Sequence, residues 1–296
     1  MNDKKLNILV TGGNGQLGRC LRDASKGSRN RYIFTDISEI PGLETVRLDI
    51  CNPDAVDIVA DSENIDVIIN CTGYTNVDKA EDETVMADQL NRQAVENLAA
   101  TAKRRGATLI HISTDYIFGG EGSQPIREDD EPSPLGVYGA TKLAGEQAVR
   151  SSACAYIIIR TAWLYSKYGR NFVKTMLQLT ESHPLVKVVS DQVGTPTYGP
   201  DLAEFIVGII DGDKLDKTGI YNYTGEGVCS WYDFASEINS LAGHKCNVTP
   251  CRTKDYPTRA KRPHYSVLDK SLVKSTFGIT IPHWTLPLKN CIQELK

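Results

Sequence analysis

Short apolar runs alternate with longer amphipathic stretches through the first 160 residues of this chain. Continuous apolar runs, rather than runs that alternate with polar residues, are typical of strands buried on both faces of a parallel sheet. The pattern predicts strands at residues 6–10, 32–35, 45–50, 67–69, 109–113 and 156–159. Repeated strand–helix–strand units of this kind predict an α/β fold, a doubly wound parallel sheet with helices on both faces.

Helix signals separate several of these runs. Asn52 before Pro53 is a favourable N-cap followed by proline at the first helical position. Residues 84–105 form one long helical pattern, and Gly106 is suited to end it in a left-handed conformation. Another helix is predicted to carry Tyr138 and Lys142.

The pattern is less regular after residue 162. Helices are predicted near 170–182, 200–211 and 230–242, strands at 186–189 and 220–223, and a loop-rich region over 250–263. We expect a first domain at residues 1–165 and a smaller C-terminal domain at 166–296. Segments between about 185 and 225 are expected to rejoin the first domain. The smaller domain should cover the open end of the sheet, where ligands bind in such folds.

Composition excludes several classes of protein. The formal net charge of −4 argues against nucleic-acid binding, which needs a basic surface. No apolar run approaches the roughly 20 residues of a membrane span, and residues 6–10 are too few for a signal sequence. The eight cysteines include no C-x-x-C pair and no zinc-like spacing. We therefore expect a cytoplasmic protein with reduced thiols and no metal site.

A glycine-rich turn follows the first predicted strand. It reads Gly13-Asn14-Gly15-Gln16-Leu17-Gly18 and opens a helix, and Asp36 ends the next strand 18 residues later. Glycines at this spacing permit a tight turn and close approach of a pyrophosphate to the helix N-terminus. An acidic residue at the end of the second strand can accept a hydrogen bond from a ribose hydroxyl. The first domain is therefore predicted to be Rossmann-like and to bind a dinucleotide.

A tyrosine and a lysine four residues apart supply candidate chemistry. Tyr138 and Lys142 should lie on one face of a helix, where the ammonium can lower the phenol pKa and prepare it as a proton donor. Thr114 ends the strand before this helix, and its hydroxyl could hydrogen-bond a carbonyl beside the phenol. Together with the dinucleotide turn, these residues indicate carbonyl–alcohol redox chemistry with a nicotinamide.

Over nearly its whole length the chain resembles the dTDP-4-dehydrorhamnose reductases, a family of the extended short-chain dehydrogenases. The tyrosine–lysine motif is common to that superfamily. More specific blocks of similarity lie at residues 77–81, 171–176 and 191–197, and the match also includes residues 262–263. The resemblance implies reduction of the C4 ketone of dTDP-4-dehydro-β-L-rhamnose to dTDP-L-rhamnose, with NADPH or NADH as the cofactor.

The resemblance also implies roles for individual residues. Tyr138 would protonate the developing alkoxide, Lys142 would bind the nicotinamide ribose, and Thr114 would hydrogen-bond the carbonyl. The other implied cofactor-binding residues are Gly12, Gly15, Gln16, Leu17, Gly18, Asp36, Asp49, Ile50, Gly73, Tyr74 and Thr75. The implied substrate-binding residues are Thr114, Asp115, Trp163, Asn171 and Arg262, the last lying in the densest basic cluster of the chain.

Several questions stay open at this stage. Asp36 favours an unphosphorylated ribose, whereas Arg19 could reach a 2′-phosphate, so use of both cofactors is expected. Some family members dimerise through magnesium held by glutamates, but Cys20 occupies the equivalent position here, and a monomer and a homodimer both remain. The alternatives are a nucleotide-sugar epimerase and a non-catalytic subunit like the methionine adenosyltransferase regulatory protein. The presence of Thr114, Tyr138 and Lys142 together argues against the second.

Overall fold

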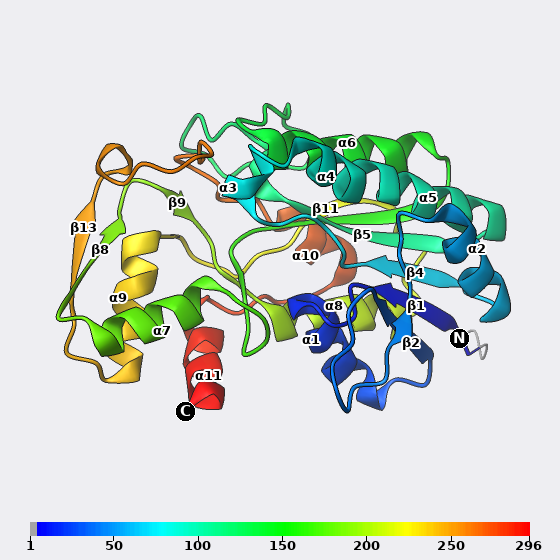
Figure 1. The fold of residues 1–296 in the computed structure, drawn as a ribbon, viewed down its shortest axis with the longest axis horizontal. Coiled ribbons are helices and arrows are strands. Elements are labelled where there is room, and N and C mark those ends of the chain that lie inside the picture. Colours follow the sequence, from blue (N-terminus) through cyan, green and yellow to red (C-terminus); the bar gives the residue numbers. More distant parts are fainter. Residues whose placement is uncertain (1–4) are drawn as a thin grey trace.

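A seven-stranded parallel sheet forms the centre of the computed structural model, which describes residues 5–296 (Figure 1). Its strand order is β11-β6-β5-β4-β1-β2-β3. The strands are β1 (Asn7–Thr11), β2 (Arg31–Asp36), β3 (Val46–Arg47), β4 (Val67–Asn70), β5 (Thr108–Thr114), β6 (Ala155–Thr161) and β11 (Gly219–Asn222). The order reverses beside β1, as in doubly wound folds, so the predicted fold class is confirmed.

Helices cover both faces of this sheet (Figure 1). One face carries α1 (Gln16–Ala24), α8 (Gly199–Asp211) and α10 (Ser271–Phe277), and the other carries α2 (Pro53–Ser62), α5 (Ala94–Arg105) and α6 (Val137–Ser151). Within β1, Ile8 and Val10 join the first of these cores, and Leu9 joins the second. Burial on both faces explains why the strands read as continuous apolar runs.

A smaller region lies beside the carboxyl ends of the sheet strands (Figure 1). Its core is formed by α7 (Phe172–Ser182), α9 (Trp231–Ala242) and α11 (Thr285–Leu295), with a parallel pair of strands, β8 (Leu185–Val189) and β13 (Asn247–Cys251). Of the later segments expected to rejoin the sheet, α8 and β11 do so. Strand β8 pairs with β13 instead.

Two local features differ from the sequence pattern. The predicted strand at 45–50 shrinks to Val46–Arg47, because only these residues pair with β2. The long predicted helix is continuous but changes character, running as α4 (Thr84–Asp88), a π-helical turn (Gln89–Gln93) and α5. Gly106 ends it at φ 67°, the left-handed conformation that glycine adopts without strain.

Short elements connect the two regions. Helix α3 (Val77–Ala80) follows β4, and the loop beyond β6 continues into β7 (Leu164–Tyr165). The remaining short strands are β9 (Val193–Gly194), β10 (Thr197–Tyr198) and β12 (Cys229–Ser230).

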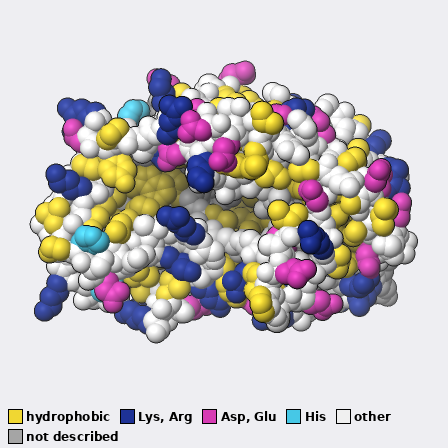
Figure 2. Space-filling model, viewed as in Figure 1, with side chains coloured by type: hydrophobic (Ala, Val, Ile, Leu, Met, Phe, Trp, Pro, Cys, Tyr) yellow, Lys and Arg dark blue, Asp and Glu magenta, His cyan; other side chains and the backbone are white. Residues whose placement is uncertain are grey.

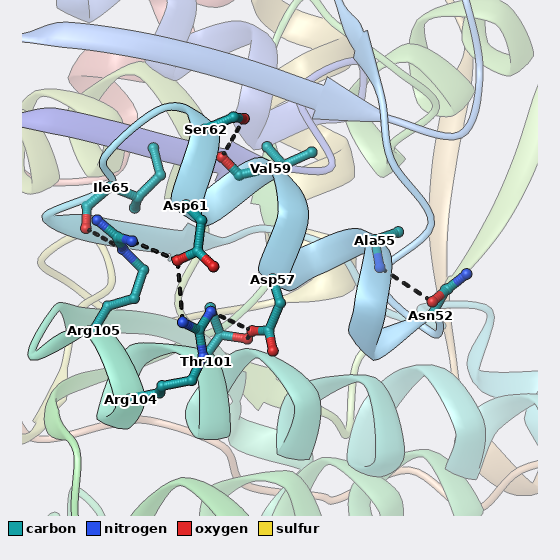
Figure 3. Close-up of polar contacts among 10 residues, drawn as sticks. All are labelled: Asn52, Ala55, Asp57, Val59, Asp61, Ser62, Ile65, Thr101, Arg104 and Arg105. Carbon is teal, nitrogen blue, oxygen red and sulfur yellow. Dashed lines mark hydrogen bonds and ion pairs between the residues drawn. The ribbon is translucent and has the colours of Figure 1, made fainter.

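Ion pairs tie α2 to α5 at the surface (Figure 3). Asp57 accepts a hydrogen bond from Thr101 at 2.5 Å and pairs with Arg104 at 2.9 Å. Asp61 pairs with both Arg104 and Arg105, at 3.1 and 2.6 Å. Because Asp57, Asp61 and Arg104 are about half exposed, their attraction is screened by water and salt.

All eight cysteines are free thiols, and burial raises the pKa of several, including Cys20. Within residues 5–296, none of the helices is both long and apolar enough to cross a membrane.

Candidate active site

The glycine-rich turn joins β1 to α1 and leaves the first backbone N–H groups of that helix without a side-chain cap. A Cβ on Gly18 would lie 2.2 Å from the carbonyl oxygen of Gly12, so only glycine fits there. Gly12 itself has φ 66°, and the first turn of α1 carries no acidic residue. The turn therefore lets a pyrophosphate approach the backbone closely, at the positive end of the α1 dipole.

Asp36 lies at the end of β2 beside this turn. One carboxylate oxygen accepts a hydrogen bond from the backbone N–H of Asn14 at 3.1 Å, and the other accepts two from Ser38. Asp36 thus braces the glycine turn at the place where an adenosine ribose is expected. The guanidinium of Arg19, the candidate partner of a 2′-phosphate, lies over the ring of Tyr168, 4.1 Å from its centre.

The other predicted cofactor-binding residues follow strand ends. Asp49 and Ile50 come after β3, where Asp49 accepts a hydrogen bond from the N–H of Cys51 and Ile50 is buried. Gly73, Tyr74 and Thr75 come after β4. The carboxyl ends of these parallel strands share one edge of the sheet with the glycine turn, as a dinucleotide site requires.

Asn91 anchors this last loop and was not identified from the sequence. It is fully buried in the π-helical turn. Its side-chain oxygen accepts from the N–H of Tyr74 at 2.9 Å, while its amide donates to the Tyr74 carbonyl and to Thr141 on α6. Such π turns are frequent at functional sites. An asparagine inside a long helical pattern was the only signal in the sequence.

Thr114, Tyr138 and Lys142 come together at the carboxyl end of β5. Thr114 is the last residue of β5 and hydrogen-bonds the phenol of Tyr138. Lys142, one turn further along α6, donates to the carbonyl of Ile112 at 2.6 Å. The ring of Tyr116 meets that of Tyr138 edge-on, with centres 5.5 Å apart.

Burial controls the charges of this group. It raises the pKa of Tyr138 to about 12, against the opposing hydrogen bond from Thr114, and lowers the pKa of Lys142 to about 8. The expectation that the lysine lowers the phenol pKa is therefore wrong for this structure, because desolvation of the phenolate outweighs any attraction to the ammonium. A phenol that stays protonated near neutral pH suits a proton donor.

Asp115 lies beside Thr114 and is 2% exposed. One carboxylate oxygen accepts from the Thr114 hydroxyl at 3.0 Å. The other is buried without a close hydrogen bond among the described residues, although the Ser266 hydroxyl lies near enough to lower the pKa of this carboxyl. Burial raises the pKa of Asp115 to about 6. A buried acceptor without a partner is costly unless a ligand supplies a donor.

Trp163 follows β6 in a strained conformation. Its φ of 49° is unusual for a bulky residue, and its indole stacks on Trp231, with ring centres 3.5 Å apart and planes 13° apart. A Cβ on Gly194 would lie 2.8 Å from the same indole, so glycine is required there. Strain of this kind is concentrated at ligand sites. Trp231 was not identified from the sequence.

Asn171 caps the N-terminus of α7. Its side-chain oxygen accepts from the N–H of Lys174 at 3.2 Å, and its amide donates to Gln16 at 2.8 Å and to the Ser166 carbonyl at 2.7 Å. Asn171 therefore connects the smaller region to the glycine turn. Its contact with substrate stays a prediction.

Arg262 lies on the loop after β13, and its guanidinium forms a two-pronged ion pair with Asp78 on α3. Two residues further on, His264 lines an open pocket of about 540 Å³ together with Asp191, Arg252, Thr253 and Lys254. Figure 2 shows the surface hollowed between the sheet and the smaller region, with hydrophobic side chains inside and both basic and acidic side chains at the rim. This hollow has the shape expected of a ligand cleft, and the basic side chains at its rim are candidates to bind an anionic group.

The position compared with the magnesium-binding glutamates is buried. Cys20 is 1% exposed on α1, and a Cβ on Gly199 would lie 2.9 Å from its sulfur. Across residues 5–296, no group of three or more His, Cys, Asp or Glu side chains is arranged to hold a metal ion.

Comparison with known proteins agrees with this geometry. The family described as RmlD substrate binding domain matches residues 6–296. The chain belongs to this family. The dTDP-4-dehydrorhamnose reductase of Aggregatibacter actinomycetemcomitans is 40% identical over 292 residues, which cover 96% of this chain and 97% of that protein. The family resemblance inferred from the sequence is thus confirmed.

Solved structures of RmlD relatives share the whole architecture. The dTDP-4-dehydrorhamnose reductase of Clostridium acetobutylicum has a TM-score of 0.91 at 44% identity, covering 98% of this chain and 99% of that one. The Bacillus anthracis enzyme, solved in complex with NADP, has a TM-score of 0.90 at 36% identity, covering 98% of this chain and all of that one.

Proposed function

We propose that this protein reduces the C4 ketone of dTDP-4-dehydro-β-L-rhamnose to dTDP-L-rhamnose, using NADPH or NADH. The observation that carries the proposal is the meeting of Thr114, Tyr138 and Lys142 at the sheet edge that also bears the glycine turn. Membership of the RmlD family and the NADP complex of its Bacillus anthracis relative support the substrate and the cofactor.

The residues divide the chemistry between them. When bound, the reduced nicotinamide supplies the hydride for C4. The single proton of the Thr114 hydroxyl, which is donated to Asp115 in this structure, would turn to the carbonyl oxygen when substrate binds. Tyr138 gives that oxygen its proton as the alcohol forms. Lys142, held by the Ile112 carbonyl, binds the nicotinamide ribose. The buried oxygen of Asp115 accepts from a sugar hydroxyl, and Trp163 packs beside the sugar.

A single assay separates this function from its rivals. The purified protein is mixed with the keto sugar and with NADPH or NADH in turn, and absorbance at the nicotinamide band is followed with sugar analysis. A reductase consumes one reduced nicotinamide per sugar. An epimerase converts sugar without net loss of reduced cofactor, and a non-catalytic subunit does neither. Either of the last two results would refute the proposal.

The site predicts a bell-shaped pH profile. Below about pH 6, Asp115 takes up a proton and loses an acceptor for substrate. Above about pH 8, Lys142 loses the proton that makes it a cation, because burial lowers its pKa from the ordinary value. Tyr138 keeps its proton across this range. The second-order rate constant kcat/KM, measured from pH 5 to 10, should therefore be highest between pH 6 and 8.

Asp115→Asn provides the matched control, because it cannot titrate. That variant should lose the acidic limb and keep the alkaline one. A wild-type profile that stays level from pH 7 to 10 contradicts the role given to Lys142.

Arg262 is proposed to bind the diphosphate of the sugar nucleotide. The glycine turn is expected to hold the cofactor pyrophosphate, so the second anion needs a separate cation when it leaves water. A guanidinium can grip phosphate oxygens with two parallel hydrogen bonds. Arg262→Ala should raise KM for the sugar nucleotide about tenfold, because a hydrogen bond to a charged group contributes about 1.5–3 kcal/mol.

The KM for the nicotinamide cofactor should hardly change in the same variant. Steady-state kinetics with each substrate varied in turn measure both constants. Unchanged sugar-nucleotide kinetics would contradict diphosphate binding by Arg262 and leave it only a structural role in its loop.

A further inference from the structure

Asp78 joins α3 to a loop more than 180 residues away along the chain. Its Oδ2 accepts from Nη2 of Arg262 at 2.6 Å, and its Oδ1 accepts from Nη1 at 3.2 Å. The same Oδ1 accepts from the backbone N–H of Ala260 at 3.0 Å. One carboxylate therefore fixes both the side chain of Arg262 and the backbone of the loop that carries it.

The pairing orients Arg262 without exhausting its donors. A guanidinium has five N–H groups. Asp78 takes one from each terminal nitrogen, and the carbonyl of Ala260 takes a second from Nη1 at 3.2 Å. The Nε–H and the second Nη2–H are directed elsewhere, and two such donors suffice for a bidentate contact with a phosphate.

Both partners stay charged. The Arg262 side chain is 20% exposed. Burial opposes its charge, but the hydrogen bonds that Arg262 donates to Asp78 outweigh this effect and raise the pKa of Arg262. The hydrogen bond from Arg262 in turn lowers the pKa of Asp78. Without Asp78, the guanidinium of Arg262 would lose the partner that fixes its orientation and neutralises its charge in a half-buried place.

The loop is also fixed relative to the catalytic helix. A Cβ on Gly120 would lie 2.4 Å from the Cβ of Pro263, so the loop packs tightly beside the turn after β5. From the same acidic segment as Asp78, Glu81 accepts a hydrogen bond from the N–H of Val137 at 2.9 Å. That residue begins α6 and precedes Tyr138. Residues 78–81 thus contact both the Arg262 loop and the first turn of the catalytic helix.

We propose that Asp78 is a positioning residue for the sugar nucleotide. It holds Arg262 at a fixed place relative to Tyr138, so that the diphosphate binds where the keto group reaches the phenol. This rests on the proposed function for the contact between Arg262 and the diphosphate and for the identity of the sugar, and the first of these holds for any nucleoside diphosphate. The alternative is that Asp78 competes with the diphosphate for Arg262. In that case removal of the Asp78 carboxylate would strengthen the binding of the diphosphate instead of weakening it.

The experiment measures the affinity for dTDP and the steady-state kinetics in a double-mutant cycle of Asp78→Ala, Arg262→Ala and the double variant. Asp78→Ala should weaken dTDP binding and raise KM for the sugar nucleotide about tenfold, since oriented hydrogen bonds to a charged group are lost. The kcat and the cofactor KM should stay within a few fold. The double variant should bind dTDP no more weakly than Arg262→Ala alone.

Asp82→Asn is the matched control. Asp82 pairs with Arg259 of the same loop at 2.8 Å, but both side chains are more than 60% exposed. Its dTDP affinity should match that of the wild type. Urea unfolding of Asp78→Ala tests whether any loss comes from misfolding. Asp78→Asn keeps the size of the side chain but replaces one acceptor oxygen by a donor, so it should also lose dTDP affinity.

Unchanged or tighter dTDP binding in folded Asp78→Ala overturns the proposal, as do additive effects in the double variant. Failure of the proposed function is a different result. In that case the wild type does not turn over the keto sugar, and the dTDP affinities still decide the role of Asp78.

Discussion

Replacing Tyr138 by phenylalanine is expected to lower kcat by about 10²–10⁴-fold, the usual contribution of a positioned general acid. The phenyl ring preserves the edge-on packing with Tyr116 and removes only the hydroxyl that Thr114 contacts. Because burial keeps the phenol protonated at neutral pH, its proton is available throughout the working range. Cofactor affinity should stay within a few fold, since the glycine turn and Lys142 are untouched.

Tyr221→Phe is a suitable control. It removes another phenol hydroxyl, one that donates to the carbonyl of Lys217 on the far edge of the sheet, and should leave kcat within a few fold. Stopped-flow absorbance under saturating cofactor separates the chemical step from product release. A Tyr138→Phe enzyme that turns over within a few fold of wild type would falsify the assignment of the proton donor.

Glu146→Ala is expected to cost about 3–5 kcal/mol of the free energy of unfolding, the range for breaking one partner out of a buried ion pair. Glu146 on α6 and Arg160 on β6 are 2% and 3% exposed and share two hydrogen bonds, at 3.0 and 2.8 Å. Arg160 also donates to the carbonyl of Glu128. Removal of Glu146 leaves a buried guanidinium without its carboxylate, and urea unfolding measures the loss.

The surface network between α2 and α5 supplies the comparison (Figure 3). Asp61→Ala also removes the partner of arginines, but Asp61 is 51% exposed, and water can replace it. Its effect on the urea midpoint should be far smaller than that of Glu146→Ala. Equal losses in the two variants contradict the argument that burial makes the Glu146–Arg160 pair important.

The parts of the site that are local in sequence could be predicted from it. The glycine turn depends on spacing within seven residues, and the Tyr138–Lys142 pair depends on one helical turn. The strands of the sheet could be predicted because β1, β4, β5 and β6 each carry a continuous apolar run. Short-range geometry determines these features.

The remaining contacts depend on how distant segments pack. Nothing near Asp78 indicates that Arg262 will reach it, and nothing near Trp163 indicates Trp231. Strand β8 was expected near the main sheet, but its pairing with β13 is decided by the core of the smaller region. The predicted lowering of the Tyr138 pKa was wrong for the same reason. The burial that raises this pKa comes from the assembled site and not from the helix that carries Tyr138.

The place of β11 and α8 in the main sheet has a consequence for biosynthesis. Both come after Trp163 in the chain, yet α8 covers one face of the sheet and β11 completes its edge beside β6. During translation, the nascent chain therefore exposes the apolar edge and face of the sheet until Asn222 has left the ribosome. Helix α10 (Ser271–Phe277) covers the same face and comes later still, so the dinucleotide half cannot complete its core until most of the smaller region has also been synthesised. Until then the exposed apolar surface is open to aggregation and to chaperones.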